Sequence, residues 1–267
     1  MLLLHLSRWG NNKQAHSGGN TMKKTGLLFS AVLLGSLMVG TGSAYAAGTG
    51  TASDPAKGTA TILFKDNDST TPPVDPTDPT KPNPDPLPDD KNDKTDASGP
   101  LSLDVYPAFF SFGEQMVDLA GGTYNSTKTG LHYLQVTDNR DDLGGWTVSM
   151  KRTEFENAAG NKLTGSGLYI PAGTARNTLV TDPTAADTNA KLGVAGGTGE
   201  FAGMYAIGLT ESKLFGYGND LANLVGKGTT AYSWDASAEK LHVPAGVAKK
   251  GTFTSTIDWT LTADVMS

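Results

Sequence analysis

Short stretches in which apolar and polar residues alternate recur from Leu101 to the end of the chain. A period of two is typical of a strand with one buried face, and the tracts between these stretches are rich in Gly, Asn, Asp and Thr, as turns are. No window of a dozen residues keeps a helical period. We therefore predict an all-β fold, an antiparallel β-sandwich or barrel of the Ig-like or Greek-key type, with strands at 101–106, 131–136, 145–151, 167–170, 240–243 and 251–262.

The last of these stretches contains the sequence T-F-T-S-T-I-D-W-T-L-T at 252–262. A strand so close to a terminus frays unless it pairs with a neighbour. Residues 145–149 read G-W-T-V-S, so Trp-Thr followed by an apolar residue occurs twice, at Trp146 and at Trp259. We expect these two strands to lie close together, in one sheet or facing each other across the sandwich.

Two segments near the N-terminus differ sharply in composition. Residues 58–65, G-T-A-T-I-L-F-K, are rich in branched and aromatic side chains and predict the first strand. Residues 70–96 hold eight of the fourteen prolines and almost no large apolar side chain. Because such a segment buries too little apolar surface to offset its ordering entropy, we predict a disordered Pro/Asp-rich tract, either a linker between two domains or an excursion from within one domain. Residues 213–225 fit a short helix or a loop.

Residues 22–46 have the features of a secretory signal peptide: two lysines, an apolar run at 26–40 and an Ala-Tyr-Ala cleavage motif. The apolar run is shorter than the roughly 20 residues that span a bilayer. We predict export and cleavage after Ala46, with residues 1–21 as an upstream extension that is not native. The mature chain is expected to be extracellular and to have no transmembrane segment.

Charge and cysteine content exclude several functions. Cleavage removes four basic residues and no acidic one, so the formal charge falls from -6 to -10. Nucleic acid is an unfavourable partner for such an acidic chain, because its phosphates require a basic face. The chain has no cysteine, which excludes disulfides, thiolate metal sites and cysteine nucleophiles.

Motifs for catalysis or cofactor binding are weak. The G-x-G-x-x-A match at 197–202 has no helical pattern after it, and the two histidines of the mature chain have no second ligand type near them in sequence. Asp138, Asp141 and Asp142 could ligate calcium or flank a glycosidic bond, but they lack the spacing of a calcium loop, and a local salt bridge with Arg140 explains them as well. We expect no enzymatic activity, no cofactor and no metal.

Trp146 and Trp259 allow two interpretations. Buried in strands, the two indoles would stabilise the core. Exposed on a face of the sheet, they would form an aromatic platform on which sugar rings stack. The sequence leaves both open.

The order of these motifs resembles the WxL domain of Gram-positive surface proteins. The resemblance covers the chain from about Lys57 onward and rests on V-T-D-N-R at 136–140 before W-T-V at 146–148, and on V-P-A at 243–245 leading into W-T-L at 259–261. The opening motif is L-S-L-D-V-Y-P at 101–107, followed by F-G. The family typically begins with a Gly-Thr-rich strand such as 58–65, so the resemblance implies one domain of residues 47–267 with the tract at 70–96 as a disordered Pro/Asp-rich insertion inside it. Val148 stands where the family usually has leucine, and the tail lacks the family's common Ser-Asp-Ala-Pro ending.

The resemblance implies a secreted protein held non-covalently on the cell wall through peptidoglycan or another wall glycan, within surface complexes for adhesion or polysaccharide use. It also implies a membrane-anchored WxL-interacting protein as a partner. The alternative is a structural or assembly subunit that binds this partner and keeps its tryptophan motifs in the core. The implied wall-binding residues, with their polar support, are Trp146, Val148, Trp259 and Leu261, and Asp138, Asn139 and Arg140.

Overall fold

The structure is a computed structural model that describes residues 50–83, 92–142, 144–218 and 225–266. The chain divides into two units, Met1–Thr61 and Ile62–Ser267. In the first unit, the described residues include a tight turn in which Thr51 and Asp54 form a bridge. The predicted upstream extension at 1–21 and the predicted signal peptide at 22–46 lie outside the described residues.

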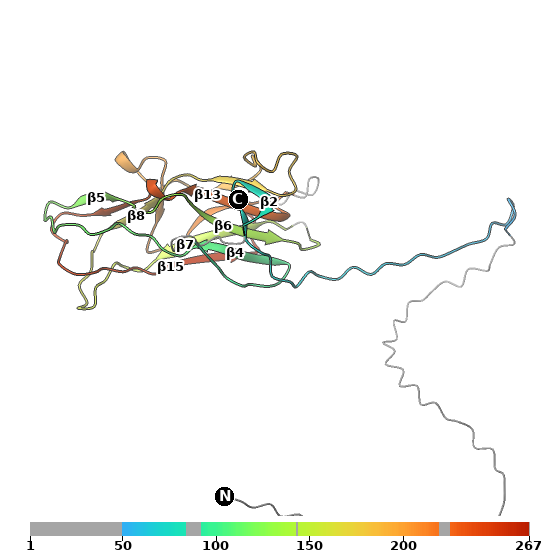
Figure 1. Cartoon of the computed structure of the whole chain (residues 1–267), viewed down its shortest axis with the longest axis horizontal. Helices are drawn as coiled ribbons and strands as arrows, with labels where there is room; N and C mark the ends of the chain where they lie inside the picture. The colour runs from blue at the N-terminus through green and yellow to red at the C-terminus, as the bar shows by residue number, and fades with distance from the viewer. Residues whose placement is uncertain (1–49, 84–91, 143, 219–224, 267) are drawn as a thin grey trace, which may run out of the picture. The chain divides into compact units, whose positions relative to one another are not determined.

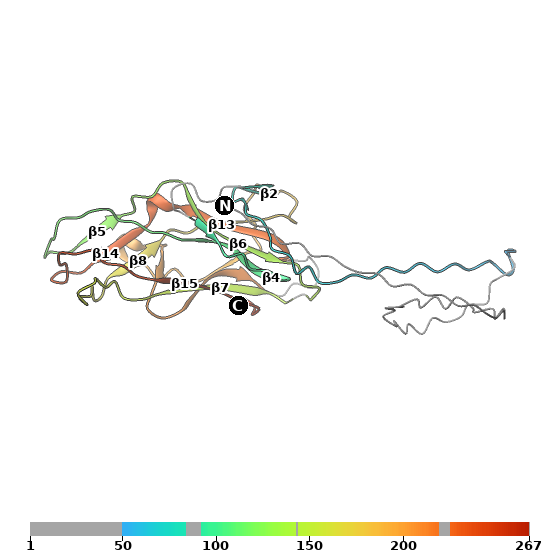
Figure 2. The same ribbon diagram turned by 60° about the horizontal axis from the view of Figure 1, so that its bottom comes forward.

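The second unit is an antiparallel β-sandwich, which confirms the predicted fold class (Figure 1, Figure 2). No α-helix occurs among the described residues; there are two short 3-10 turns, η1 (Gly199–Phe201) and η2 (Ala236–Ala238). The strands in chain order are β1 (Val74–Asp75), β2 (Asp78–Pro82), β3 (Asn92–Lys94), β4 (Leu101–Pro107), β5 (Gly122–Asn125), β6 (Leu131–Asp138), β7 (Trp146–Arg152), β8 (Gly167–Ile170), β9 (Thr174–Asn177), β10 (Lys191–Leu192), β11 (Tyr205–Ile207), β12 (Ser212–Tyr217), β13 (Gly228–Asp235), β14 (Lys240–Val243) and β15 (Ile257–Thr262).

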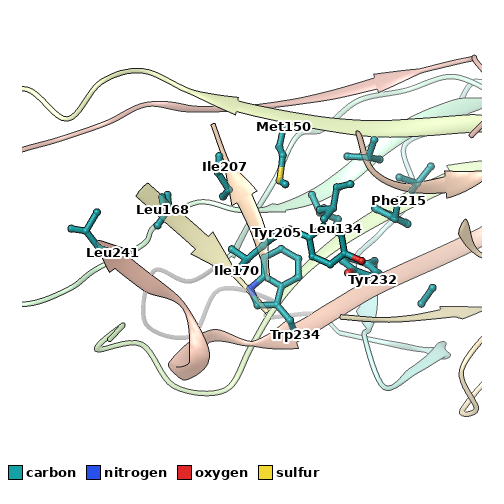
Figure 3. Packing of buried hydrophobic residues seen from close by; sticks show 14 of the residues in the cluster. Leu134, Met150, Leu168, Ile170, Tyr205, Ile207, Phe215, Tyr232, Trp234 and Leu241 are labelled. Atoms are coloured by element: carbon teal, nitrogen blue, oxygen red, sulfur yellow. The ribbon is translucent and has the colours of Figure 1, made fainter. Parts of the chain in front are cut away.

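Three larger sheets and one hairpin contain these strands. The sheet orders are β3-β4-β6-β13-β9, β11-β8-β14-β5 and β10-β12-β7-β15, and β1 pairs with β2. Strand β13 runs between β6 and β9 and brings Tyr232 and Trp234 into the core. Figure 3 shows these two rings among apolar side chains from several strands, and Tyr232 stacks on Phe215 with 4.5 Å between ring centres. Each fully buried side chain of this size stabilises the fold by about 1.5–3 kcal/mol.

Every strand predicted from Leu101 onward is present, with β8 and β14 matching their predicted bounds. The last strand is shorter than predicted, because the residues before Ile257 form no continuous ladder: Thr254 makes an isolated bridge with Glu156, and Ser255 and Thr256 hydrogen-bond to Thr153. The prediction of a helix or loop at 213–225 is wrong for its first part, which is strand β12. A register shift between Lys213 and Phe215 breaks the alternation there, so the strand pattern is not visible in the sequence.

The prediction of a first strand at 58–65 is wrong. These residues have no strand partner in the described part of the chain, and all of them are exposed. Ile62 is 78% exposed and Phe64 is 83% exposed. The pattern is that of a strand, but a strand forms only against a neighbour that completes its backbone hydrogen bonds.

The prediction of a disordered insertion at 70–96 is wrong for the described residues of this tract. They form the β1–β2 hairpin and strand β3, which pairs with β4. Pro76 and Pro79 are buried. Proline has few conformations to lose when it is ordered, so its buried ring can offset the cost of fixing the chain. Residues 84–91 lie outside the described residues.

Buried side chains of β4 and β6 hold this tract in place. The amide of Gln135 accepts a hydrogen bond from the backbone nitrogen of Val74 at 2.8 Å, and donates to the carbonyl of Pro72 at 3.0 Å and to Asp104 Oδ2 at 3.1 Å. Asn92 of β3 donates to one backbone carbonyl of β6 and accepts from one of its backbone N–H groups. Polar side chains thus replace the apolar contacts that the tract lacks.

Asp104 gives this region an expected pH dependence. Burial raises the pKa of its carboxyl, while hydrogen bonds from Ser102, Thr137 and Gln135 oppose that rise. Between its ordinary and its raised pKa, the folded state binds more protons than the unfolded state, so the stabilisation from this group is lost as pH rises through that window. As pH rises through this window, the free energy of unfolding of the wild type, measured with urea, should fall relative to that of Asp104→Asn. A pH-independent difference would contradict this.

Candidate functional site

The two tryptophan motifs lie on neighbouring strands. Strand β15 pairs antiparallel with β7 over its whole length, with Trp259 opposite Met150 and Leu261 opposite Val148. Both views show the two strands side by side (Figure 1, Figure 2). This confirms the expectation that the strands lie close together and assigns them to one sheet.

Trp146 is a core residue. Its side chain is 0% exposed, its indole Nε1 donates to the carbonyl of Gly226 at 3.0 Å, and its ring meets Phe215 and Tyr217 edge to face. The preceding Gly145 allows this packing, since a Cβ there would lie 2.1 Å from the carbonyl oxygen of Tyr217. The first motif therefore joins β7, β12 and the turn before β13.

Trp259 is in a different environment. It lies on β15, the outer strand of its sheet, and is only half-buried, with its ring centre 6.3 Å from that of Trp234. Its Nε1 atom is buried and has no hydrogen-bond partner. Ile257 and Leu261, on the same face of the strand, are also half-buried. The second motif thus keeps part of its apolar surface accessible.

A buried ionic cluster fixes the entry to β7. Asp138 accepts two hydrogen bonds of 2.9 Å from the Arg140 guanidinium and one of 3.1 Å from Lys227 Nζ. Arg140 also donates to the carbonyls of Gly144 and Gly145 at 2.9 and 3.1 Å. The hydrogen bond to Asp138 raises the pKa of Arg140. This cluster connects the end of β6 to the residue before Trp146 and to the start of β13.

The predicted polar support residues do not act as one group. The Asn139 side chain is exposed, and its backbone nitrogen donates to the carbonyl of Pro100 at 2.6 Å. Asp142 lies 3.7 Å from both Arg140 and Lys227, and a hydrogen bond from the Gly144 backbone lowers its pKa. Among the described residues, no cluster of three or more His, Asp or Glu side chains could hold a metal ion.

Sequence reasoning missed the partners that come from distant strands. Lys227 is 89 positions from Asp138, and no local pattern links the two. His132 also has a buried acidic neighbour, Glu239, with 2.5 Å between Nδ1 and Oε1, which its sequence context did not indicate. Strand β13 could have been found, because T-T-A-Y-S-W alternates and is bounded by Gly228 and Asp235.

The predicted wall-binding residues differ in accessibility. Trp146 and Val148 are fully buried, so neither presents a surface to a glycan in this fold. Trp259 and Leu261 keep partial access. The geometry favours the core interpretation for the first tryptophan, and the role of the four residues in wall binding remains a prediction.

The described part of the chain is therefore an antiparallel β-sandwich domain in which two Trp-Thr-apolar strands pair in one sheet. The sequence model described as WxL domain surface cell wall-binding matches residues 51–264, and the chain belongs to this family. It is therefore associated with the cell wall at the cell surface. No curated protein and no solved structure matches the chain. No helix in its described part is long and apolar enough to cross a bilayer.

Proposed function

We propose that the chain is an exported, non-enzymatic protein that attaches non-covalently to peptidoglycan of the Gram-positive cell wall. The observation that carries this proposal is the match of residues 51–264 to a cell wall-binding family. Because Trp146 and Val148 are buried, the first motif builds the fold. Glycan would then contact accessible surfaces elsewhere, including the exposed part of the half-buried Trp259 on the outer strand β15.

Charge does not favour this binding. The predicted mature chain is acidic and wall polymers are themselves anionic, so attachment rests on stacking and hydrogen bonds. Such contacts are only weakly screened by salt. Binding should therefore persist at high ionic strength.

Co-sedimentation of the mature chain with purified peptidoglycan tests the proposal. The wild type should pellet with the glycan in low and in high salt, and Trp259→Ala should raise the Kd about tenfold, as loss of a contact worth about 1.4 kcal/mol would. Leu192→Ala is a matched control, because Leu192 is an exposed apolar residue on the opposite outer strand of the same sheet. No sedimentation of the folded wild type would exclude peptidoglycan attachment, and glycan cleavage would exclude a non-enzymatic role.

A second candidate is an assembly subunit that binds a membrane-anchored WxL-interacting protein within an adhesion or polysaccharide-related complex. The full burial of Trp146 favours it, since a buried motif builds a scaffold and contributes no ligand surface. This candidate predicts that the purified partner binds the wild type without glycan, and that Trp259→Ala binds peptidoglycan as well as the wild type.

A further inference from the structure

Residues 58–65 form an exposed segment with the pattern of a strand. Ala60, Ile62 and Phe64 would lie on one face of an extended chain, and mainly polar residues on the other. Ile62, Leu63 and Phe64 are 78%, 63% and 83% exposed. Such a β-prone apolar segment with unpaired backbone groups is the kind of sequence that adds to another sheet.

Strand β15 offers an edge that could receive such a segment. It pairs with β7 on one side only, and its six residues make it the longest outer strand in the described sheets. Its inward row, Ile257, Trp259 and Leu261, packs on the core yet stays half-buried. The buried Nε1 of Trp259 has no acceptor. An added strand would complete the backbone hydrogen bonds of this edge and cover the row.

We propose that residues 58–65 of one copy of this chain add as a strand to the outer edge of β15 in a second copy. The sheet β10-β12-β7-β15 would gain a fifth strand, and the apolar face with Ile62 and Phe64 would cover the row around Trp259. Because donor and acceptor are different surfaces, each added copy leaves a free donor and a free acceptor, so the contact generates an open chain of subunits.

The position of Thr70 argues against docking within one chain. Thr70 forms a bridge with Ser98, shortly before β4. At the start of β4, Leu101 pairs with Asp138 at the end of β6. Arg140 donates to Asp138 and to the carbonyl of Gly145, which directly precedes β7. That end of β7 lies opposite the end of β15. The chain therefore enters the sandwich at the end where β15 finishes.

The connection from Lys65 to Thr70 spans at most about 17 Å when extended, which is less than the roughly 20 Å length of a six-residue strand. From its entry point, the chain's own segment could follow β15 only in parallel. Every strand pair described in this fold is antiparallel, and antiparallel pairing is slightly more stable per residue. A second copy is free of this restraint and can dock antiparallel.

Cysteine cross-linking tests the proposal directly, because the chain contains no cysteine. One variant carries Thr61→Cys in the donor segment 58–65. It is mixed under mild oxidation with a second variant that carries a cysteine on the outward face of β15 and a tag of different length, so that the mixed disulfide can be told from the homodimers by size. Positions Asp258, Thr260 and Thr262 cover the possible registers. At least one pair should give the mixed disulfide with a yield about tenfold above that of Asn125→Cys, a control on the outer strand β5 of another sheet.

A second measurement uses the apolar face of the donor. Ile62→Asp should abolish both the mixed disulfide and concentration-dependent oligomers in analytical sedimentation, whereas Thr59→Asp should leave both unchanged. Since residue 62 is exposed, the variant keeps its fold, and its binding to peptidoglycan separates this proposal from wall attachment. A monomeric wild type with no cross-link above the control would overturn the proposal. So would a disulfide that forms only within a chain carrying both cysteines.

Discussion

Trp146→Ala is expected to lower the free energy of unfolding by about 3–5 kcal/mol, the range for truncation of a buried tryptophan. The change opens a cavity between β7 and β12 and removes the edge contacts with Phe215 and Tyr217. It also leaves the carbonyl of Gly226 without its indole donor. Urea denaturation followed by circular dichroism measures the loss.

Trp259→Ala is the matched control, because it is the other motif tryptophan on the paired strand. It should cost less, since Trp259 is half-buried and its Nε1 has no partner to lose. If Trp146→Ala instead unfolded at the urea concentration of the wild type and lost peptidoglycan binding, its indole would be a ligand contact and the core assignment would be wrong.

The difference between the two tryptophans explains how much of this fold can be predicted from the sequence. Period-two alternation is local information, and it located the strands around Trp146 and Trp259. The repeated Trp-Thr motif predicted that these strands lie close together, and the structure pairs them in one sheet. It cannot show which row of a strand is covered, because that depends on strands elsewhere in the chain. Trp146 is covered by β12, whereas β15 has no hydrogen-bonded strand on its outer side in the described sheets.

The same limit explains the two errors near the N-terminus. Residues 58–65 have a correct strand pattern, but the described residues supply no partner for it. The proline-rich tract has no such pattern, yet it is ordered because Gln135, more than sixty positions from Val74, supplies the hydrogen bonds. In both cases the local composition gives only the intrinsic tendency of the segment. Whether the segment is ordered depends on partners that are distant in sequence.

The ionic cluster at the entry to β7 is a case in which the local motif was recognised but its main partner was not. V-T-D-N-R predicted a salt bridge between Asp138 and Arg140, which the structure contains. Lys227 completes the cluster from the other side and brings the start of β13 against the end of β6. The carboxylate therefore lies between two cations, and its loss should matter more than the loss of a surface ion pair.

Asp138→Ala is expected to lower the free energy of unfolding by about 3–5 kcal/mol, because it leaves a buried cation without its partner. The Lys227 side chain is only 8% exposed, and Asp142, at 3.7 Å, is its remaining acidic neighbour. Asp141→Ala is the matched control: Asp141 is an exposed neighbour in the same turn, and its loss should change stability by no more than about 0.5 kcal/mol.

The double variant Asp138→Ala with Lys227→Met separates the ionic contribution from simple loss of contacts. Removing the cation along with its partner should restore part of the stability, since no unpaired charge then remains buried. Thermal and urea unfolding of the wild type, Asp138→Ala, Lys227→Met and the double variant give the coupling energy. Equal losses for Asp138→Ala and Asp141→Ala would show that the buried carboxylate of Asp138 does not stabilise the entry to β7.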